Sequence, residues 1–193
     1  MADRTLGVLD LQGDVEAHVA AFARLGLPAR RVKTAAALRE VHGLVIPGGE
    51  SSTVGMLLVR FGLMRLLRER IGEGLCVFGT CTGLILMARE IEGSRQERIG
   101  CLDVSVLRNA YGRQVDSFEE DLDIPVLGTE PMRAVYIRAP RITRIGPEVE
   151  VLARSGDVPV AVRQGRLLGA SFHPELTHDD RMHRYFQQMV TAA

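Results

Sequence analysis

Short apolar runs alternate with amphipathic stretches through the first half of the chain, and this rhythm limits the possible folds. Apolar runs at 6–11, 44–46 and 75–78 have the length and composition of buried strands. Helical periodicity follows each run, at 15–25, at 54–67 with an interruption at Gly62, and at 83–90. Parallel strands need long crossovers, usually helices that pack on the faces of the sheet. We therefore predict an α/β protein with a mostly parallel sheet and helices on both faces.

The second half of the chain is richer in extended segments. Five of them are predicted as strands, at 104–107, 134–137, 149–152, 158–163 and 167–171. The last two flank Gln164-Gly165-Arg166, a plausible hairpin turn, so this part of the sheet should be antiparallel. A final helix is predicted at about 179–190. With no internal repeat or linker, the 193 residues are expected to form a single domain, 1–193, with an antiparallel extension.

Charge balance and the length of the apolar runs limit the classes of function. Lys plus Arg and Asp plus Glu each number 24, so the net charge of zero argues against nucleic-acid or membrane-surface binding driven by bulk charge. The N-terminal sequence lacks the apolar core of a secretory signal, and no run approaches the roughly 18 residues of a membrane span. We therefore expect a cytoplasmic protein. Its three cysteines should be free thiols, because their number is odd and their spacings match no zinc pattern.

Cys81 lies in Gly79-Thr80-Cys81-Thr82-Gly83, between a predicted buried strand and a predicted helix. This is the thiol form of the G-x-S-x-G nucleophile elbow, a sharp and often strained turn that exposes the reactive side chain. The flanking glycines remove Cβ atoms that would clash there. The backbone N–H of Thr82 is then placed to donate to an oxyanion. Taken alone, the pattern fits a buried thiol equally well, which is also our interpretation of Cys76 and Cys101.

His173 and Glu175 are the candidate base and orienting group for this thiol. They follow a predicted strand, and sites in α/β proteins gather at the carboxyl ends of strands. In an extended backbone their side chains point the same way, so Glu175 can accept from one imidazole nitrogen while the other faces the thiol. In isolation, His-Pro-Glu fits a capping glutamate beside a surface histidine. Three further histidines are expected at solvated or boundary positions of helices: His18, His178 and His183.

The segment Pro47-Gly48-Gly49-Glu50-Ser51 also connects a predicted strand to a predicted helix. Such a loop offers several backbone N–H groups to an anion, and a phosphate site is its generic interpretation. The segment lacks the Gly-Lys-Ser/Thr ending of a Walker loop. Beside a cysteine nucleophile, the loop is better explained as the source of a second oxyanion donor, from Gly49.

These motifs resemble class I glutamine amidotransferases, through Pro-Gly-Gly-Glu-Ser, Gly-Thr-Cys-x-Gly-Leu-Ile and Ser-Phe-His-Pro-Glu. The resemblance narrows to the family of glutaminase subunits of pyridoxal phosphate synthase. Four stretches carry this narrowing, at 7–15, 108–119, 136–140 and 171–177. Since they run from residue 7 to residue 177, the resemblance covers nearly the whole chain.

The resemblance implies a flavodoxin-like three-layer fold and hydrolysis of L-glutamine by Cys81, with His173 shuttling the proton and Glu175 orienting it. It implies an oxyanion hole from Gly48, Gly49 and Thr82, and no cofactor or metal. The ammonia would pass to a (β/α)8 synthase subunit of a hetero-oligomeric complex, and the isolated chain would be weakly active. The implied glutamine site consists of Gly49, Glu50, Ser51, Arg108, Ile137 and Arg138. A guanidinium suits this site because it pairs bidentately with a carboxylate.

Two positions depart from the family pattern. Thr82 stands where the family usually has alanine, and activity should survive because only the backbone N–H is needed. Asp14 stands where the family often has an apolar residue, in a region, together with His18, that in the family meets the synthase subunit. Three alternatives stay open: an amidotransferase of another pathway, which the 108–119 stretch disfavours, a hydrolase or peptidase on the same fold, and a non-catalytic subunit, which the intact Cys-His-Glu set disfavours.

Overall fold

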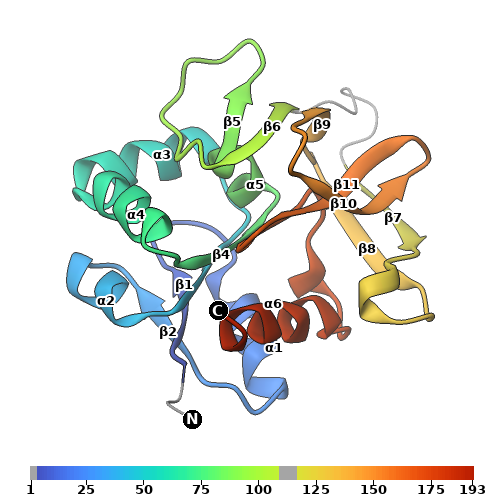
Figure 1. The fold of residues 1–193 in the computed structure, drawn as a ribbon, viewed down its shortest axis with the longest axis horizontal. Helices are drawn as coiled ribbons and strands as arrows, with labels where there is room; N and C mark the ends of the chain where they lie inside the picture. Colours follow the sequence, from blue (N-terminus) through green and yellow to red (C-terminus); the bar gives the residue numbers. More distant parts are fainter. Residues whose placement is uncertain (1–3, 109–116) are drawn as a thin grey trace.

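The computed structural model describes residues 4–108 and 117–193. Its central element is a seven-stranded sheet with the order β10-β11-β12-β4-β3-β1-β2 (Figure 1). Five neighbouring strands are parallel: β12 (Leu167–Ala170), β4 (Cys76–Thr80), β3 (Gly43–Ile46), β1 (Leu6–Leu9) and β2 (Ala29–Val32). Two antiparallel strands extend the sheet beyond β12: β11 (Val158–Gln164) and β10 (Glu150–Ser155). The predicted mostly parallel sheet with an antiparallel extension is confirmed.

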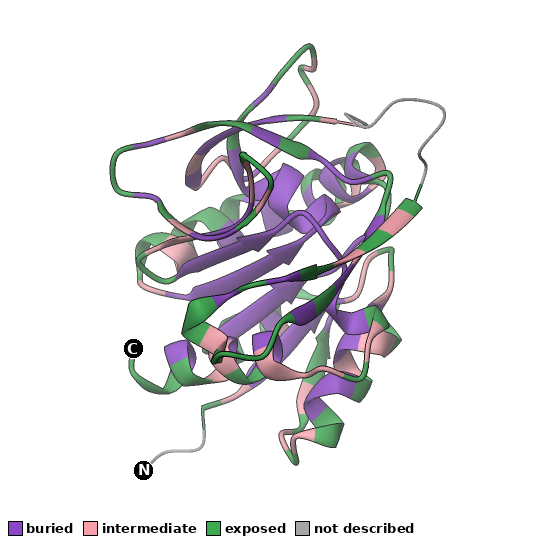
Figure 2. Cartoon of the chain, turned by 90° about the vertical axis from the view of Figure 1, so that its right-hand side faces the viewer, coloured by how far each residue is buried: buried purple, intermediate pink, exposed green. Residues whose placement is uncertain are grey.

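Helices cover both faces of this sheet. One face packs against α1 (Val15–Arg24) and α6 (Arg181–Thr191), and the other against α2 (Ala35–Glu40), α3 (Ser51–Arg60), α4 (Leu63–Gly72) and α5 (Thr82–Met87). Successive strand residues divide between the two cores, because their side chains alternate across the sheet. Phe78 thus packs with α1 and α6, and Val77 with the helices of the opposite face. Figure 2 shows the strands buried between these layers, as the predicted three-layer fold requires.

Five other strands form two smaller sheets. One contains β5 (Ala88–Ile91), β6 (Leu102–Leu107) and β9 (Arg141–Ile145), and the other pairs β7 (Ser117–Leu122) with β8 (Met132–Ile137). Single 3-10 turns occur at η1 (Pro125–Leu127) and η2 (Pro174–Leu176). Sequence patterns do not predict α2, β5, β7 or β9. β7 shows why: it carries three acidic residues and is a strand through its antiparallel pairing with β8.

Two predicted helices differ from the observed ones. Residues 54–67 belong to two helices, because Gly62 adopts a left-handed conformation (φ 67°) between α3 and α4. Residues 83–90 are helical only as far as Met87, where the backbone becomes extended and continues as β5. Every residue of α5 is buried, so the helix has no alternation of apolar and polar faces. Its end therefore leaves no signal in the sequence pattern.

Four adjacent parallel strands end at the same edge of the sheet: β1, β3, β4 and β12. The segments that leave this edge carry Gln12 after β1, Gly48 after β3, Cys81 after β4 and His173 after β12. In open α/β sheets, ligands bind outside the carboxyl ends of the strands. The fold therefore brings together four segments that are far apart in the sequence.

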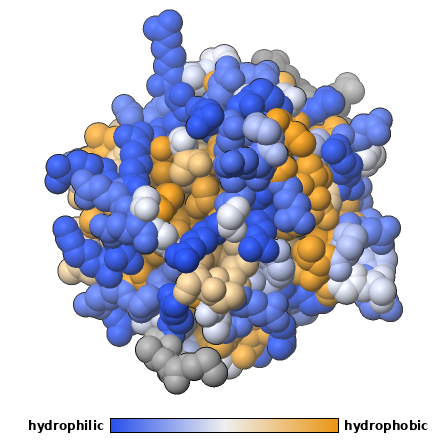
Figure 3. Space-filling model, in the orientation of Figure 1, coloured by the Kyte–Doolittle hydropathy of each residue, from blue (hydrophilic) through white to orange (hydrophobic). Residues whose placement is uncertain are grey.

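The surface is of mixed character. Hydrophilic residues cover most of the face seen in Figure 3, and hydrophobic residues lie between them in smaller areas. Within residues 4–108 and 117–193, no helix has the length and apolar character needed to cross a membrane.

Gly83 allows α5 to approach β3 closely. A Cβ added there would lie 2.1 Å from the carbonyl oxygen of Ile46, so the backbone would have to shift. We expect Gly83→Ala to lower the free energy of unfolding by about 1–3 kcal/mol, measured by urea denaturation. The matched control is Gly72→Ala at the end of α4, where an added Cβ has no atom within 4 Å. Equal losses of stability in the two variants would contradict the close approach of α5 and β3.

Candidate active site

The backbone at Cys81 forms the predicted sharp turn. Cys81 has φ 47° and ψ −98°, a conformation that non-glycine residues rarely adopt. It lies between the last residue of β4 and the first residue of α5, and its N–H donates to the carbonyl of Ala170 in β12 at 2.8 Å. The side chain is mostly buried, with Sγ 3.9 Å from the carbonyl oxygen of Ile137. Such strain persists only where the surroundings enforce it, which is typical of a functional position.

His173 and Glu175 form the predicted pair. Imidazole Nδ1 lies 2.7 Å from carboxylate Oε1, and both side chains are buried. The backbone differs from the expected extended form, because Pro174 starts the 3-10 turn η2 and His173 caps it. The turn folds Glu175 back onto the imidazole, and the His173 N–H is held by the carbonyl of Val135 in β8 at 2.8 Å. Ring atom Nε2 of His173 is thereby left for the thiol.

Electrostatics favours the charged forms of this pair. Burial by itself disfavours an imidazolium, but hydrogen bonds with Cys81 and Glu175 outweigh it and raise the pKa of His173 to about 10. Burial likewise disfavours the Glu175 carboxylate, yet the neighbouring imidazoles of His18 and His173 hold the pKa of this carboxyl well below its usual range. An ionised Glu175 can only accept hydrogen bonds, so Nδ1 of His173 carries the proton between them.

The glycine loop is held by three hydrogen bonds. The Gly48 carbonyl accepts from the N–H of Asp14 at 3.2 Å, and the N–H of Glu50 donates to Gln12 Oε1 at 2.8 Å. The Gly49 carbonyl accepts from the Thr82 hydroxyl at 2.5 Å. The Thr82 side chain therefore contacts the loop, which sequence reasoning did not foresee.

Gly48 also has a steric role beside the imidazole. A Cβ added at Gly48 would lie 2.3 Å from Cε1 of His173, so a larger residue would displace the ring. The Gly48 carbonyl is turned towards Asp14, and in a trans peptide the N–H of the next residue points to the opposite side. The N–H of Gly49 is thereby directed away from Asp14.

A cavity of about 300 Å³ opens between these segments. It is lined by ten of the residues that the sequence predicts for the site: Gly48, Gly49, Glu50, Ser51, Cys81, Thr82, Arg108, Ile137, Arg138 and His173. Glu175 does not line the cavity and contacts it through His173. The lining also includes four residues absent from that prediction: Gln12, Gly13, Asp14 and Ile85. The first three could have been found from their position in the sequence, since they lie in the segment that leaves β1.

Charged groups of both signs meet in this cavity. Arg108 lies 3.1 Å from Glu50 Oε1 and also donates to Gln96 Oε1 at 2.5 Å. Burial raises the pKa of Glu50, but hydrogen bonds with Ser52 and the charges of Arg108 and Arg138 leave it lowered overall. Arg138 has φ 45°, so the cavity contains a second residue with a strained backbone. Residues 109–116, part of the 108–119 stretch, lie outside the described residues.

Cys76 is a buried thiol, as expected, whereas Cys101 is only partly buried. Cys76 is fully buried in β4, and burial raises its pKa. Burial also raises the pKa of Cys101, to about 12. Among the residues that the structure describes, no three His, Cys, Asp or Glu side chains are arranged to hold a metal ion.

The predictions for His18 and His183 are wrong, because both side chains are fully buried. His18 lies 3.5 Å from the Glu175 carboxylate and 2.9 Å from His183. The sequence does carry a signal for His18: it is three residues after Val15 and four before Phe22, so it falls on the apolar face of α1. Because apolar Val19 comes directly after it, His18 is instead expected at the boundary between the apolar and polar faces of the helix.

Nearly the whole chain matches a known family. The model of the SNO glutamine amidotransferase family covers residues 8–192. This chain belongs to that family. Curated relatives of the amidotransferase carry the name pyridoxal 5'-phosphate synthase subunit PdxT. The relative from Carboxydothermus hydrogenoformans is 54% identical over 185 residues, which are 96% of this chain and 97% of the relative. The one from Thermus thermophilus is 53% identical over 187 residues, with 96% and 97% covered.

Solved structures agree with the family. A crystal structure of a glutamine amidotransferase matches this one with a TM-score of 0.93 at 50% identity, covering 97% of this chain and 99% of the other. A glutamine amidotransferase from Thermotoga maritima has a TM-score of 0.60 at 14% identity, covering 100% of this chain and 85% of the other. The second likeness concerns the fold alone.

The Thr82 hydroxyl should stabilise the glycine loop of the amidotransferase. We expect Thr82→Ala to lower kcat/KM for glutamine roughly three- to tenfold, because one hydrogen bond contributes about 0.5–1.5 kcal/mol. The backbone N–H of residue 82 remains in this variant, so measurable activity should survive. Thr82→Ser keeps the hydroxyl and is the matched control. If Ala and Ser variants release glutamate at the same rate as the natural chain, the hydroxyl has no role in holding the loop.

Proposed function

We propose that the chain hydrolyses L-glutamine to L-glutamate and ammonia as the glutaminase subunit of a pyridoxal 5'-phosphate synthase. The observation that carries this proposal is the strained Cys81 beside the hydrogen-bonded His173–Glu175 pair, on the rim of a cavity with charges of both signs. The family and the name of the relatives support the substrate and the assembly. Cys81, His173 and Glu175 then act as the catalytic triad.

The first half-reaction forms a thioester. The thiolate of Cys81 adds to the side-chain amide carbon of glutamine, and His173, which has taken the thiol proton, returns a proton to the departing ammonia. The tetrahedral oxyanion accepts from the N–H of Thr82, at the start of α5, and from the Gly48–Gly49 loop. The first N–H groups of a helix have no acceptor within the helix, which leaves that of Thr82 available. The direction of the Gly49 N–H, away from Asp14, supports its use as the second donor.

The second half-reaction removes the glutamyl group. His173, now neutral, takes a proton from water, which attacks the thioester carbonyl, and the thiolate of Cys81 leaves. Glutamate is released, and His173 regains its starting protonation state. Glu175 stays ionised throughout, because its role is to hold Nδ1 of His173 and to stabilise the imidazolium.

Glutamine carries a carboxylate and an ammonium group, and the cavity offers a partner for each. The guanidinium groups of Arg108 and Arg138 suit the carboxylate, and the carboxylate of Glu50 suits the ammonium. Ile137, with its carbonyl oxygen 3.9 Å from Cys81 Sγ, lies beside the reacting carbon. Gly49 and Ser51 complete the proposed glutamine site. The site needs no cofactor or metal for this reaction, since the nucleophile and proton carrier are both side chains.

The partner that we propose is a (β/α)8 synthase subunit, in a cytoplasmic hetero-oligomeric complex that receives the ammonia. The segment after β1 offers a route by which such a partner controls the oxyanion loop. Gln12 and Asp14 each hold a backbone group of the loop by a hydrogen bond. A Cβ at Gly13 would lie 1.8 Å from the Gly48 carbonyl oxygen, so the two backbones touch. Any displacement of residues 12–14 is therefore transmitted to Gly48 and Gly49.

Cys81→Ala tests the nucleophile. We expect glutamate release to fall by at least roughly a thousandfold, because removal of a catalytic nucleophile leaves only binding and oxyanion stabilisation. Cys101→Ser is the matched control, since this thiol lies outside the cavity, and it should keep the natural kcat. Glutamine hydrolysis that persists in Cys81→Ala would show that another group is the nucleophile.

Addition of the synthase partner tests the assembly. We expect the isolated chain to release glutamate slowly and the complex to release it faster, with the gain in kcat. The control is the synthase subunit of an amidotransferase from another pathway, which should give no gain in kcat. An isolated chain that is already as fast as the complex would contradict the proposed control of the loop.

A further inference from the structure

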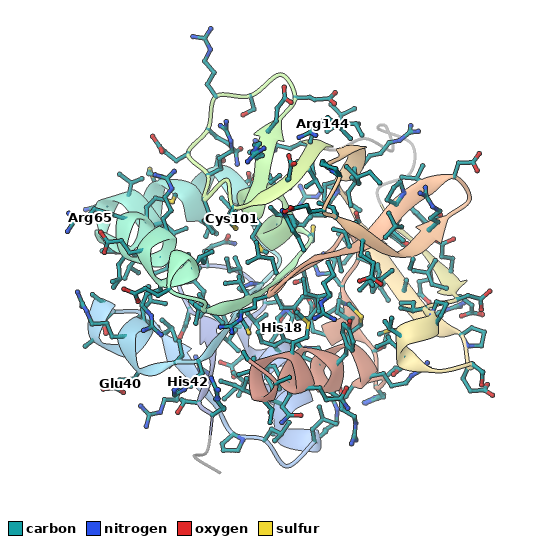
Figure 4. The ribbon with its side chains drawn as sticks, viewed as in Figure 1. His18, Glu40, His42, Arg65, Cys101 and Arg144 are labelled. Carbon is teal, nitrogen blue, oxygen red and sulfur yellow. The ribbon has the colours of Figure 1, made fainter. Side chains whose placement is uncertain are left out.

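Behind the proposed triad, two fully buried histidines continue the line of polar groups into the core. His18 comes from α1 and His183 from α6, the two helices that cover the same face of the sheet. Figure 4 shows His18 in the layer between the central sheet and α6. Neither residue lines the cavity. Buried polar rings that bind no substrate require an explanation, because burying an imidazole without hydrogen bonds costs free energy.

The ring of His18 lies between two elements of the proposed site. Its Nε2 is 3.2 Å from Thr80 Oγ1 and 3.5 Å from Glu175 Oε2. Thr80 is the last residue of β4 and directly precedes Cys81. Glu175 Oε1 is taken by His173, while Oε2 is buried with no hydrogen-bond partner at normal distance among the described residues. His18 is therefore the polar group that faces the second oxygen of the Glu175 carboxylate.

The contacts of the two histidines allow their protons to be assigned. His183 Nδ1 is buried without a partner in the described part of the chain, and burial lowers the pKa of His183 to about 3, so this ring is neutral. A proton on Nδ1 would leave a buried donor unsatisfied, and the assignment that avoids this places the proton on Nε2. Nε2 of His183 then donates to Nδ1 of His18, 2.9 Å away. His18 is left with its own proton on Nε2, facing Thr80 and Glu175.

We propose that His18 is a positioning residue of the triad and that His183 sets its tautomer. His18 presents an N–H to the second carboxylate oxygen of Glu175, which keeps that carboxylate ionised and in place while His173 gains and loses its proton. The inference rests on the proposed catalytic roles of Cys81, His173 and Glu175. A buried carboxylate without this N–H is destabilised as an anion, and a neutral carboxyl orients the imidazole less well.

Aromatic rings hold the two histidines in this arrangement. Phe78 of β4 contacts both imidazoles edge-on, with ring centroids at 6.5 Å from His18 and 6.1 Å from His183. Phe22 of α1 makes an edge contact with His183 at 5.1 Å. These rings exclude water from the pair and leave it few other polar neighbours. The pair of histidines is thus fixed by the packing of α1 and α6 on the sheet.

Two substitutions of similar polarity separate positioning from packing. His18→Gln can place an amide N–H near the position of Nε2, whereas His18→Asn reaches only as far as Nδ1. We expect His18→Asn to lower kcat roughly ten- to hundredfold with an unchanged KM, the usual loss when a group that orients a reactive side chain is removed. His18→Gln should recover most of that loss. Val190→Ala in α6 is the control for stability, because it loosens the same core and removes neither a polar atom nor a ring that contacts the histidines.

The pH profile gives a readout that a purely structural role would not move. The titratable groups facing Glu175 are His173 from its own segment and His18 from α1, with His183 of α6 behind His18. In His18→Asn, the Glu175 carboxyl should take up a proton at higher pH, so the acid limb of kcat/KM should move to higher pH. Val190→Ala should keep the natural profile at a lower melting temperature. Both would be measured by glutamate release from the complex with the synthase subunit.

The outcomes also separate this inference from the proposed function. Wild-type complex must release glutamate and the Cys81→Ala complex must not; a failure there contradicts the function itself. If the function holds but His18→Asn and His18→Gln share the kcat and pH profile of Val190→Ala, the positioning role is wrong. A tenfold or larger gap in kcat between Asn and Gln, at equal thermal stability, supports it.

Discussion

The backbone conformation of Cys81 is the constraint on which the site depends. With φ at 47°, the chain turns sharply from β4 into α5, and the Cys81 N–H remains bonded to β12. The turn fits only because α5 can approach β3, and Gly83 makes that approach possible. The hydrogen bond to β12 and the packing of α5 on β3 therefore enforce the strained backbone of Cys81. The same turn places the Thr82 hydroxyl on the Gly49 carbonyl, so nucleophile and loop are fixed together.

A second constraint is the burial of charge. Glu175 is almost fully enclosed, and an isolated carboxylate in such a place would be neutral. His173 on one oxygen and His18 near the other offset the loss of water and keep the group ionised. The polar line from Cys81 to His183 thus runs from the edge of the sheet into the layer formed by α1 and α6. The ionised state of Glu175 therefore depends on side chains of the core.

Local sequence predicted the parts of the site that local geometry determines. The elbow at Cys81 and the His173–Glu175 pair are short motifs with their own turn chemistry, and the strand-helix rhythm predicted the central sheet. Interactions between distant segments were missed: the burial of His18, the contact of Thr82 with Gly49 and the strands β7 and β9. His18 follows the apolar period of α1, but only the packing of α6 shows that its ring is enclosed. The end of α5 was missed because a fully buried helix has no polar face.

Trapping the covalent intermediate tests the central claim, that Cys81 is the nucleophile of a glutaminase, most directly. The complex would be quenched in acid during turnover of L-glutamine, digested, and searched by mass spectrometry for a γ-glutamyl thioester. The geometry predicts this group on the peptide that contains Cys81, and its accumulation when deacylation is slowed. A glutamyl group on Cys76 or Cys101, or steady glutamate release with no acylated cysteine at any time point, would contradict the claim.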